Sequence, residues 1–347
     1  MTRPGTSAAG APVPGPLPLV PLGRAALPVS TLGFGAAPLG GLYAPLSEEE
    51  SDAVLQAAWD AGVRYFDTAP HYGVGLSEER LGRFLRDKPR SEYVISTKAG
   101  RLLTPHDGPV SEVQGVDGFH GTPNRVRVRD YSRDGVLRSH EESLRRLGLD
   151  HVDVVFVHDP DEYAGQALRE AYPALAGLRD EGSVSSVGVG MNQVGVPLTF
   201  VRETDIDVLL VAGQYTLLRA EAGRELLPLC RRRGVDVVGA GAFNSGLLAA
   251  PGPDASYDYA AAPAPLVARA RRIAAVCARH RVTLAAAALA FTRRHPAVRT
   301  VLAGMRTPAE VRENAAAMAA EVPAELWNEL RDEGLLPPEE DAGGPRS

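Results

Sequence analysis

The sequence has few of the features that mark secreted, membrane-spanning or nucleic-acid-binding proteins. Its 347 residues include only two cysteines, Cys230 and Cys277, which are too far apart in sequence to suggest a disulfide framework or a metal-ligand motif. No apolar run approaches the roughly 20 residues that a transmembrane helix requires. With 37 basic and 43 acidic residues, the chain also lacks the excess positive charge typical of nucleic-acid binding. These absences favour a cytoplasmic protein without membrane or nucleic-acid partners. We expect a monomer or a small homo-oligomer.

The two ends of the chain differ in composition from its middle. Residues 1–18 are rich in Pro, Gly and Ala, contain no uninterrupted apolar segment suited to a signal peptide, and are typical of a flexible tail. Residues 336–347 have a similar character. No linker divides the residues between these ends. The sequence therefore predicts a single domain over residues 19–335 with flexible termini.

Short apolar runs alternate with amphipathic segments throughout this domain. Most of the runs are rich in Val and Ile, which is typical of strands buried on both faces. The eight runs cover residues 31–36, 63–66, 93–97, 152–157, 184–189, 208–211, 235–238 and 299–302. The alternation predicts an α/β fold with parallel strands.

The segments between the runs carry helix signals. Ser47 and Glu50 have the spacing of a capping box, and Gly62 stands where a helix would end. Between Ser132 and Gly148, leucines recur on one helical face.

Eight strand–helix repeats favour a (β/α)8 barrel, the TIM barrel fold, with an N-terminal β-hairpin. A doubly wound open sheet is the alternative, but it predicts G-x-G-x-x-G after the first strand. Residues 33–38 carry Pro38 in place of the third glycine. In a barrel, the chemistry is expected at the C-terminal ends of the strands.

Polar residues follow three consecutive predicted strands. Asp67, Lys98 and His158 end the second, third and fourth strands, and Tyr72 lies in the loop after Asp67. Tyrosine has a pKa of about 10 and is a poor base at neutral pH, but a neighbouring lysine cation lowers that pKa. Each residue alone could be structural, as a loop cap, a buried histidine or ordinary packing. Their placement on adjacent strand ends predicts a proton-transfer site.

Two segments around these residues resemble the signatures of the aldo-keto reductases. The first is residues 62–73 with Ser77 and Glu78, and the second is residues 143–153 leading to His158. The resemblance extends from about residue 22 to residue 318. It implies a catalytic tetrad, listed here with its roles: Tyr72 as general acid/base, Lys98 as the group that tunes its pKa, Asp67 as the partner of Lys98, and His158 as the residue that orients the reacting oxygen. It also implies hydride exchange with NAD or NADP, without a metal.

The resemblance further assigns cofactor contacts to the first two strands and the last four strands. Asn192 and Gln214 are expected at the nicotinamide carboxamide, and the small residues after the seventh strand are expected to offer N–H donors to the pyrophosphate. The tyrosine that commonly stacks on the nicotinamide is replaced by Ala240, so that stacking passes to Phe243 or is absent. The expected cofactor residues are Gly35, Ala36, Asp67, Asn192, Gln214, Asn244, Ser245, Gly246, Leu247, Gly304, Arg306, Glu310 and Asn314.

Two of these positions bear on the choice of cofactor. NADP-dependent members have a lysine and an arginine near the 2′-phosphate, where this sequence has Gly304 and Glu310. Because a glutamate repels a phosphate and accepts from a ribose hydroxyl, NAD is favoured over NADP. NADP stays open as the alternative cofactor, because the Arg306 side chain could reach a 2′-phosphate.

Residues 35–43, 100–103, 130–132, 158–161 and 243–246 resemble the sugar-oxidising branch of the family. That branch oxidises a cyclic hemiacetal to a lactone, which implies an aldose substrate of the L-fucose or D-threo type. Oxidation of pyridoxal and general reduction of aldehydes or ketones stay open as alternative activities.

The long segment from about residue 103 to residue 131 is expected to face the substrate, although an insertion without a role is the alternative. Candidate pocket walls are Tyr43, His71, Tyr131, Asp159 and Phe243.

Two other functions are compatible with a barrel. Lys98 could form a Schiff base, as in an aldolase, but this leaves Asn192 and Gln214 unexplained. A non-catalytic barrel that binds nicotinamide and regulates a partner leaves the tetrad unexplained.

Overall fold

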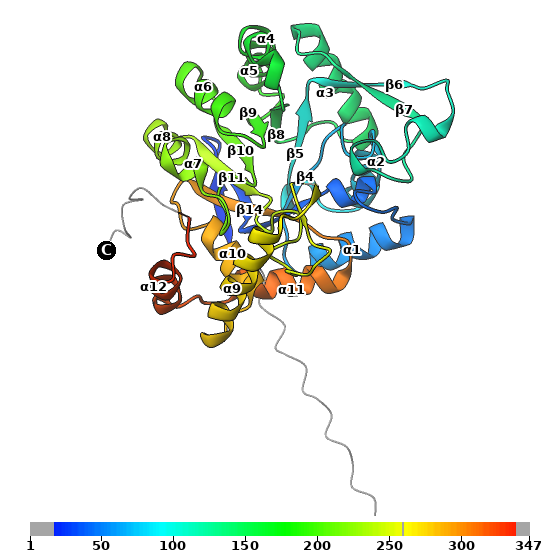
Figure 1. Cartoon of the computed structure of the whole chain (residues 1–347). Coiled ribbons are helices and arrows are strands. Elements are labelled where there is room, and N and C mark those ends of the chain that lie inside the picture. Colours follow the sequence, from blue (N-terminus) through cyan, green and yellow to red (C-terminus); the bar gives the residue numbers. More distant parts are fainter. Residues whose placement is uncertain (1–16, 259, 338–347) are drawn as a thin grey trace, which may run out of the picture.

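The eight apolar runs form eight parallel strands that close into a barrel (Figure 1). The computed structural model describes residues 17–258 and 260–337. In order around the barrel the strands are β3 (Leu32–Gly35), β4 (Tyr65–Asp67), β5 (Val94–Ala99), β8 (Val154–His158), β9 (Ser186–Met191), β10 (Val208–Ala212), β11 (Asp236–Ala240) and β14 (Val298–Gly304), which pairs with β3. The predicted (β/α)8 barrel is confirmed, and each predicted run overlaps one of these strands.

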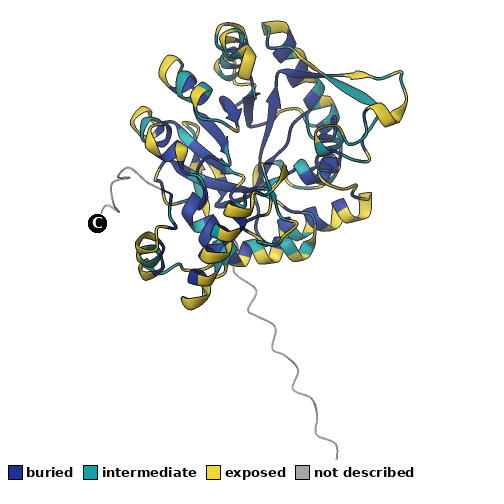
Figure 2. Cartoon of the chain, in the orientation of Figure 1, coloured by how far each residue is buried: buried dark blue, intermediate teal, exposed yellow. Residues whose placement is uncertain are grey.

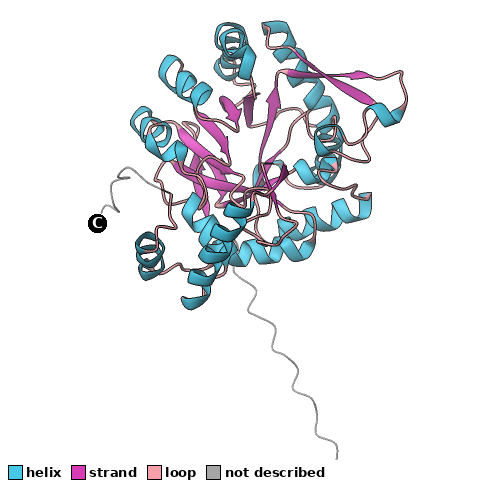
Figure 3. Cartoon of the chain, in the orientation of Figure 1, coloured by secondary structure: helices cyan, strands magenta, loops and turns pink. Residues whose placement is uncertain are grey.

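Helices surround the barrel, as Figure 3 shows. They are α1 (Glu48–Asp60), α2 (Leu76–Leu85), α3 (Arg133–Leu147), α4 (Ala164–Gln166), α5 (Tyr172–Asp180), α6 (Gly195–Glu203), α7 (Glu221–Arg224), α8 (Leu226–Arg233), α9 (Ala264–Arg279), α10 (Leu284–Thr292), α11 (Pro308–Ala319) and α12 (Ala324–Asp332). The helix ends that the sequence predicts for α1 and α3 are confirmed. Ser47 and Glu50 form the capping box of α1, and α3 begins after its N-cap Ser132 and ends at left-handed Gly148.

Apolar side chains are buried on both sides of the barrel wall. Figure 2 shows the strands of the barrel mostly in dark blue and the outward faces of the helices in yellow. One cluster fills the space between strands and helices, and a smaller one includes Tyr65, Phe156 and Leu210. Burial on both faces explains why the strands appear in the sequence as continuous apolar runs.

The N-terminal β-hairpin is present as predicted, formed by β1 (Leu19–Leu22) and β2 (Leu27–Ser30). Leu22 and Val29 are fully buried and belong to the smaller apolar cluster, together with Phe156 of the barrel. Gly23 in the hairpin turn lies against Ser186 and Val208, the first residues of β9 and β10, so the hairpin covers the end of the barrel at which the strands begin.

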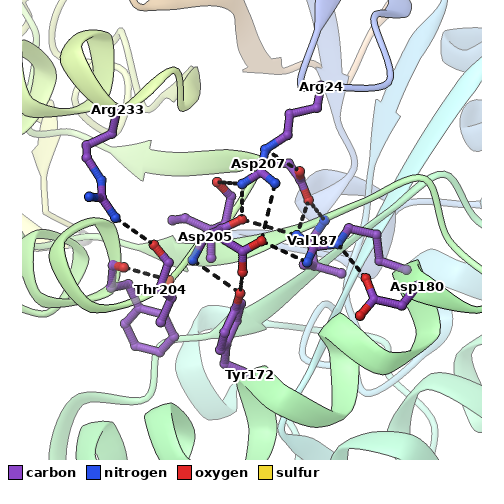
Figure 4. A network of polar contacts seen from close by, with 11 residues as sticks. Arg24, Tyr172, Asp180, Val187, Thr204, Asp205, Asp207 and Arg233 are labelled. Atoms are coloured by element: carbon purple, nitrogen blue, oxygen red, sulfur yellow. Dashed lines mark hydrogen bonds and ion pairs between the residues drawn. The ribbon is translucent and has the colours of Figure 1, made fainter.

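Charged residues fix the turn of this hairpin to the barrel (Figure 4). The carboxylate of Asp207, which is 1% exposed, accepts from the backbone N–H of Val187 at 3.0 Å and from Arg179 Nη1 at 3.1 Å. Its other oxygen lies 3.2 Å from Nε of Arg24 in the hairpin turn. Arg24 and Arg179 also bind Asp205. The network connects the hairpin to β9, β10 and α5.

The predicted tails lie mostly outside the described residues. At their boundaries, Leu17 is 5% exposed, and the carbonyl of Pro18 accepts from Thr31 N–H at 2.9 Å. Leu336 packs against the core. These three residues therefore belong to the packed part of the chain.

The long segment after β5 has structure of its own. β6 (Arg101–Pro105) and β7 (Arg125–Arg129) form an antiparallel hairpin, with two short 3₁₀ turns between them. This hairpin differs from the long loop that the sequence predicts, although the Arg-Val-Arg-Val-Arg alternation of β7 is a period-two signal for a strand. A second small hairpin, β12 (Ser256–Tyr257) with β13 (Ala260–Ala261), follows β11.

Within the described residues, no single helix is long and apolar enough to cross a membrane. Only α9 and α10, which are bent by 101° to each other, pass the test of length and composition as a pair.

Candidate active site

Four polar residues meet where β4, β5 and β8 end, and we call them the tetrad cluster: Asp67, Tyr72, Lys98 and His158. Lys98 is at its centre and only 1% exposed. Its Nζ donates to Asp67 Oδ2 at 2.6 Å, to the Thr68 carbonyl at 2.9 Å and to Tyr72 Oη at 3.1 Å. All three protons of the ammonium group therefore have acceptors.

Two glycines hold the loop that carries Tyr72. Gly73 has φ +61°, and a Cβ there would lie 2.4 Å from the Gly40 carbonyl oxygen. A Cβ at Gly40 would likewise lie 2.6 Å from Gly73 N. The loops after β3 and β4 can approach this closely only because both residues lack side chains.

A serine that the sequence analysis missed supports Asp67. Ser96 Oγ donates to Asp67 Oδ1 at 2.7 Å, so both carboxylate oxygens are bonded. Ser96 precedes Lys98 by two residues on β5. Because alternate residues of a strand face the same side, the spacing was a usable signal.

Burial and charge act in opposite directions on Lys98 and Tyr72. Burial alone would lower the pKa of Lys98, but the Asp67 carboxylate and Tyr72 outweigh it, so that this pKa is raised. Burial raises the pKa of Tyr72 above 10, and the charge of Lys98 only partly offsets this. The expected effect of Lys98 on Tyr72 is therefore present, but the net shift is upward because desolvation is larger.

Two histidine rings stand beside Tyr72. The ring of His158 is 6.0 Å from that of Tyr72 at an interplanar angle of 87°, and His71 is 5.7 Å from His158. Burial, followed by the charge of Arg101, lowers the pKa of His158 well below 6.5 and that of His71 to about 2. Both rings are therefore neutral at physiological pH, and a neutral imidazole N–H can donate to a substrate oxygen.

The β6–β7 hairpin segment contributes a residue that covers this cluster. Phe119 is 3% exposed, stacks on Tyr72 with ring centroids 6.2 Å apart, and meets His71 edge-on at 5.4 Å. It also forms a β-bridge with Leu42, and the N–H of His120 donates to Gly41 at 3.0 Å. The segment that was expected to face the substrate thus contacts the tetrad cluster.

The five candidate pocket walls have different environments. Asp159 lies next to His158 Nε2, at 3.4 Å, and His71 contacts both Tyr72 and Phe119. Tyr43 is exposed, and Phe243 packs partly against the core. Tyr131 is wrong as a pocket wall, because it is fully buried and its hydroxyl is directed at backbone carbonyls.

The expected cofactor residues lie on neighbouring strand ends, because β9, β10, β11, β14 and β3 are consecutive in the barrel. Gln214 Nε2 donates to the Asn192 carbonyl at 2.6 Å, and Gly304 and Gly35 are paired across β14 and β3. The N–H of Ala36 donates to the Asp67 carbonyl at 2.8 Å, so this edge adjoins the tetrad cluster.

Asn244 provides the observation that fits a ligand here. It is 3% exposed, and neither its side-chain nitrogen nor its side-chain oxygen has a hydrogen-bond partner among the described residues. Buried polar atoms are normally paired, so the amide is suited to a polar ligand at this strand end. A dinucleotide, with its many oxygens, satisfies such a group.

The backbone of the same loop differs from expectation. Asn244, Ser245 and Gly246 all have positive φ, at 46°, 57° and 99°. The N–H groups of Asn244, Gly246 and Leu247 donate to carbonyls within the loop. The turn therefore uses the N–H groups of Asn244 and Gly246 itself in this conformation. Contact of this loop with a pyrophosphate stays a prediction.

Arg306 and Glu310 are linked at the start of α11. Glu310 accepts from the backbone N–H of Arg306 at 2.8 Å, while its own N–H donates to Thr307 Oγ1 at 3.2 Å. The Arg306 guanidinium donates to the carbonyls of Leu42 and Pro45 at 2.7 and 3.1 Å. Asn314, one turn further along α11, is partly exposed.

Comparison with known proteins places the chain among enzymes. The Aldo/keto reductase family profile matches residues 31–333. A D-threo-aldose 1-dehydrogenase of Pseudomonas sp is 46% identical over 319 residues, covering 90% of this chain and 96% of that protein. A pyridoxal 4-dehydrogenase of Microbacterium luteolum is 44% identical, covering 91% and 97%. A Klebsiella pneumoniae aldo/keto reductase solved with NADP and acetate has a TM-score of 0.68 at 22% identity, covering 94% and 98%.

Proposed function

Because the chain belongs to the aldo/keto reductase family, and is an NAD(P)-dependent oxidoreductase, we propose that it oxidises the hemiacetal of an aldose at the anomeric carbon to a lactone. The observation that carries the chemistry is the buried Lys98 ammonium, 2.6 Å from Asp67 and 3.1 Å from Tyr72. The 46% identity to an enzyme named for aldose oxidation supports the substrate class.

In this proposal Tyr72 Oη removes the proton of the anomeric hydroxyl. The phenolate that does so is stabilised by Lys98 Nζ, whose charge is in turn held by Asp67. His158, as a neutral imidazole, donates to the same substrate oxygen and orients it. Because burial raises the pKa of Tyr72 above 10, its hydroxyl is mostly protonated at neutral pH, and the phenolate fraction increases as pH rises. Oxidation is therefore expected to accelerate as pH rises, and reduction, in which Tyr72 gives the proton, to accelerate as pH falls.

Asn192, Gln214 and Asn244 would hold the cofactor, with the start of α11 at its adenosine end. A bound nicotinamide supplies the hydride acceptor for the oxidation. The residues of the tetrad cluster need only move one proton and hold the substrate oxygen in place.

The cofactor that we favour is NAD. By the family resemblance, Glu310 takes the position of a residue that faces the 2′ group, and its carboxylate would repel a phosphate there. The Arg306 guanidinium is already bonded to the carbonyls of Leu42 and Pro45, so contact with a phosphate would break two hydrogen bonds. Replacing Glu310 by Gln should raise the kcat/KM ratio of NADP to NAD by about fivefold, since a full charge repulsion at such a site is worth on the order of 1 kcal/mol.

A second candidate is oxidation of pyridoxal, favoured by the 44% identity to an enzyme named as a pyridoxal 4-dehydrogenase.

The test of both candidates is a panel of aldoses, pyridoxal and simple aldehydes with NAD⁺ and NADP⁺, in which formation of the reduced nicotinamide is followed by its absorbance. We expect turnover of aldoses to be highest and to fall by more than 10³-fold in Tyr72→Phe. Tyr172→Phe, which removes a hydroxyl that binds Asp205 at the opposite end of the barrel, is the matched control. Undiminished activity of Tyr72→Phe would refute the mechanism, and turnover of pyridoxal alone would select the second candidate.

A further inference from the structure

Asp159 has an unusual backbone conformation. It is the first residue after β8, and its φ is +40°, in the left-handed region that residues other than Gly rarely adopt. In an extended strand, successive side chains point to opposite faces. The left-handed turn instead brings Asp159 to the same side as His158, with Oδ2 3.4 Å from His158 Nε2.

Neighbouring residues hold this strained turn in place. Tyr131 Oη lies 2.5 Å from the His158 carbonyl oxygen and 2.8 Å from that of Asp159. The Asp159 N–H donates to Gly190 at 3.0 Å. Gly100, with φ +109°, makes room for the tyrosine, since a Cβ there would lie 2.4 Å from Tyr131 Cε1. Strained residues persist only where the surroundings fix them, and they concentrate at functional sites.

Arg101 completes the arrangement from β6. Its Nη2 donates to Asp159 Oδ2 at 2.9 Å. The side chain of Arg101 is 9% exposed, and within the described residues its buried Nε has no hydrogen-bond partner. The side chain of Asp159 is 23% exposed. The Asp159 carboxylate, an acceptor, and the Arg101 guanidinium, a donor, thus lie beside His158 in a fixed orientation.

The proton transfer proposed above does not need this pair. Tyr72, Lys98 and Asp67 move the proton, and His158 already orients the reacting oxygen. A carboxylate next to a guanidinium is, however, suited to a hydroxyl group, which can donate to the one and accept from the other.

The spacing indicates which hydroxyl. His158 Nε2 and Asp159 Oδ2 are 3.4 Å apart. Oxygens on neighbouring carbons lie about 3 Å from each other, which is also hydrogen-bond distance. If the reacting oxygen binds His158, the oxygen on the next carbon is within reach of Asp159.

We propose that Asp159 and Arg101 bind the hydroxyl on the carbon adjacent to the reacting one, so that the enzyme selects α-hydroxy aldehydes and their cyclic hemiacetals. This rests on the proposed oxidation of aldoses. Tyr131 is then a positioning residue, which keeps the Asp159 peptide in its left-handed turn.

The test compares an aldose with its 2-deoxy counterpart, using NAD⁺ and the full-length enzyme. Asp159→Asn removes the charge but tolerates the left-handed conformation, so the fold should be retained. We expect kcat/KM for the aldose to fall by about 10- to 100-fold, as for a lost hydrogen bond to a charged group, and kcat/KM for the 2-deoxy sugar to change by less than about threefold. Asp87→Asn, at an exposed aspartate just beyond α2, is the control and should change neither.

A second variant separates positioning from stability. Tyr131→Phe should raise KM for the aldose more than for the 2-deoxy sugar while kcat changes less, whereas a merely structural role would lower both substrates' rates equally. Equal losses on both sugars in Asp159→Asn, or no loss, would overturn the inference and leave aldose oxidation standing. Wild-type enzyme that turns over other aldehydes but no aldose would overturn both proposals.

Discussion

Removing the Lys98 ammonium should lower the free energy of unfolding, because it leaves the Asp67 carboxylate buried without its charged partner. In Lys98→Met the Asp67 carboxylate, 2% exposed, would keep only the hydrogen bond from Ser96 Oγ at 2.7 Å. The Thr68 carbonyl would also lose its 2.9 Å donor. Breaking a buried ion pair on one side costs about 3–5 kcal/mol, and we expect a loss of that size in the free energy of unfolding.

The second partner provides the decisive comparison. Asp67→Asn combined with Lys98→Met removes both charges at nearly constant volume, and such replacements are often close to neutral. The double variant should therefore be at least about 2 kcal/mol more stable than Lys98→Met alone. Lys88→Met is the matched control, because Lys88 is the only other lysine in the chain and its ammonium binds Gln56 near the surface. It should cost less than about 1 kcal/mol.

The measurement is urea denaturation followed by far-ultraviolet circular dichroism for wild type, both single variants, the double variant and the control. The reasoning is refuted if the double variant is no more stable than Lys98→Met, or if Lys98→Met loses no more than Lys88→Met. Oxidation kinetics on the same samples show whether activity follows the charge at position 98 or only the stability.

The remaining predictions concern stability elsewhere. The pKa of His71 is about 2 in the folded protein and about 6.5 when unfolded, so only the unfolded chain binds this proton below pH 6.5. Stability from this group is therefore complete above pH 6.5 and decreases by about 1.4 kcal/mol per pH unit as pH falls; His71→Asn should have a flatter acid limb in urea titrations between pH 4 and 7, and an unchanged slope would contradict the assignment. Asp207→Asn should lower the unfolding free energy by about 2 kcal/mol, because Arg179 and Val187 lose a charged acceptor. Asp180→Asn, which neutralises a carboxylate on the exposed side of Arg179, should cost less than about 0.5 kcal/mol, and equal losses in the two variants would argue against the network.

The barrel could be predicted from the sequence because its determinants are local. Strands buried on both faces appear as Val-rich runs, and the ends of α1 and α3 follow from Ser47 and Gly148. Strand order around a barrel follows chain order, so Asp67, Lys98 and His158 could be placed on adjacent strand ends before any geometry was known.

The rest of the site depends on pairings between distant residues. Arg101 and Asp159 are separated by 58 positions, and nothing local in either segment indicates that they meet. Tyr131 is a residue type that commonly lines substrate pockets. Only the contacts of its buried hydroxyl with two backbone carbonyls show that its role is structural. The net direction of the Tyr72 pKa shift also required the structure, because it is a balance between desolvation and the charge of Lys98.

The β6–β7 hairpin suggests how members of such a fold can change substrates without rebuilding their chemistry. Its two strands pair only with each other, and they lie outside the closed barrel that carries Asp67 and Lys98. Phe119 reaches the site from the connection between the strands, while the barrel is complete without it. The hairpin is thus an addition to the barrel that is bonded to its loops through Arg125 and Arg127, and we expect exchange of residues 101–129 for the corresponding segment of a relative to change the substrate preference.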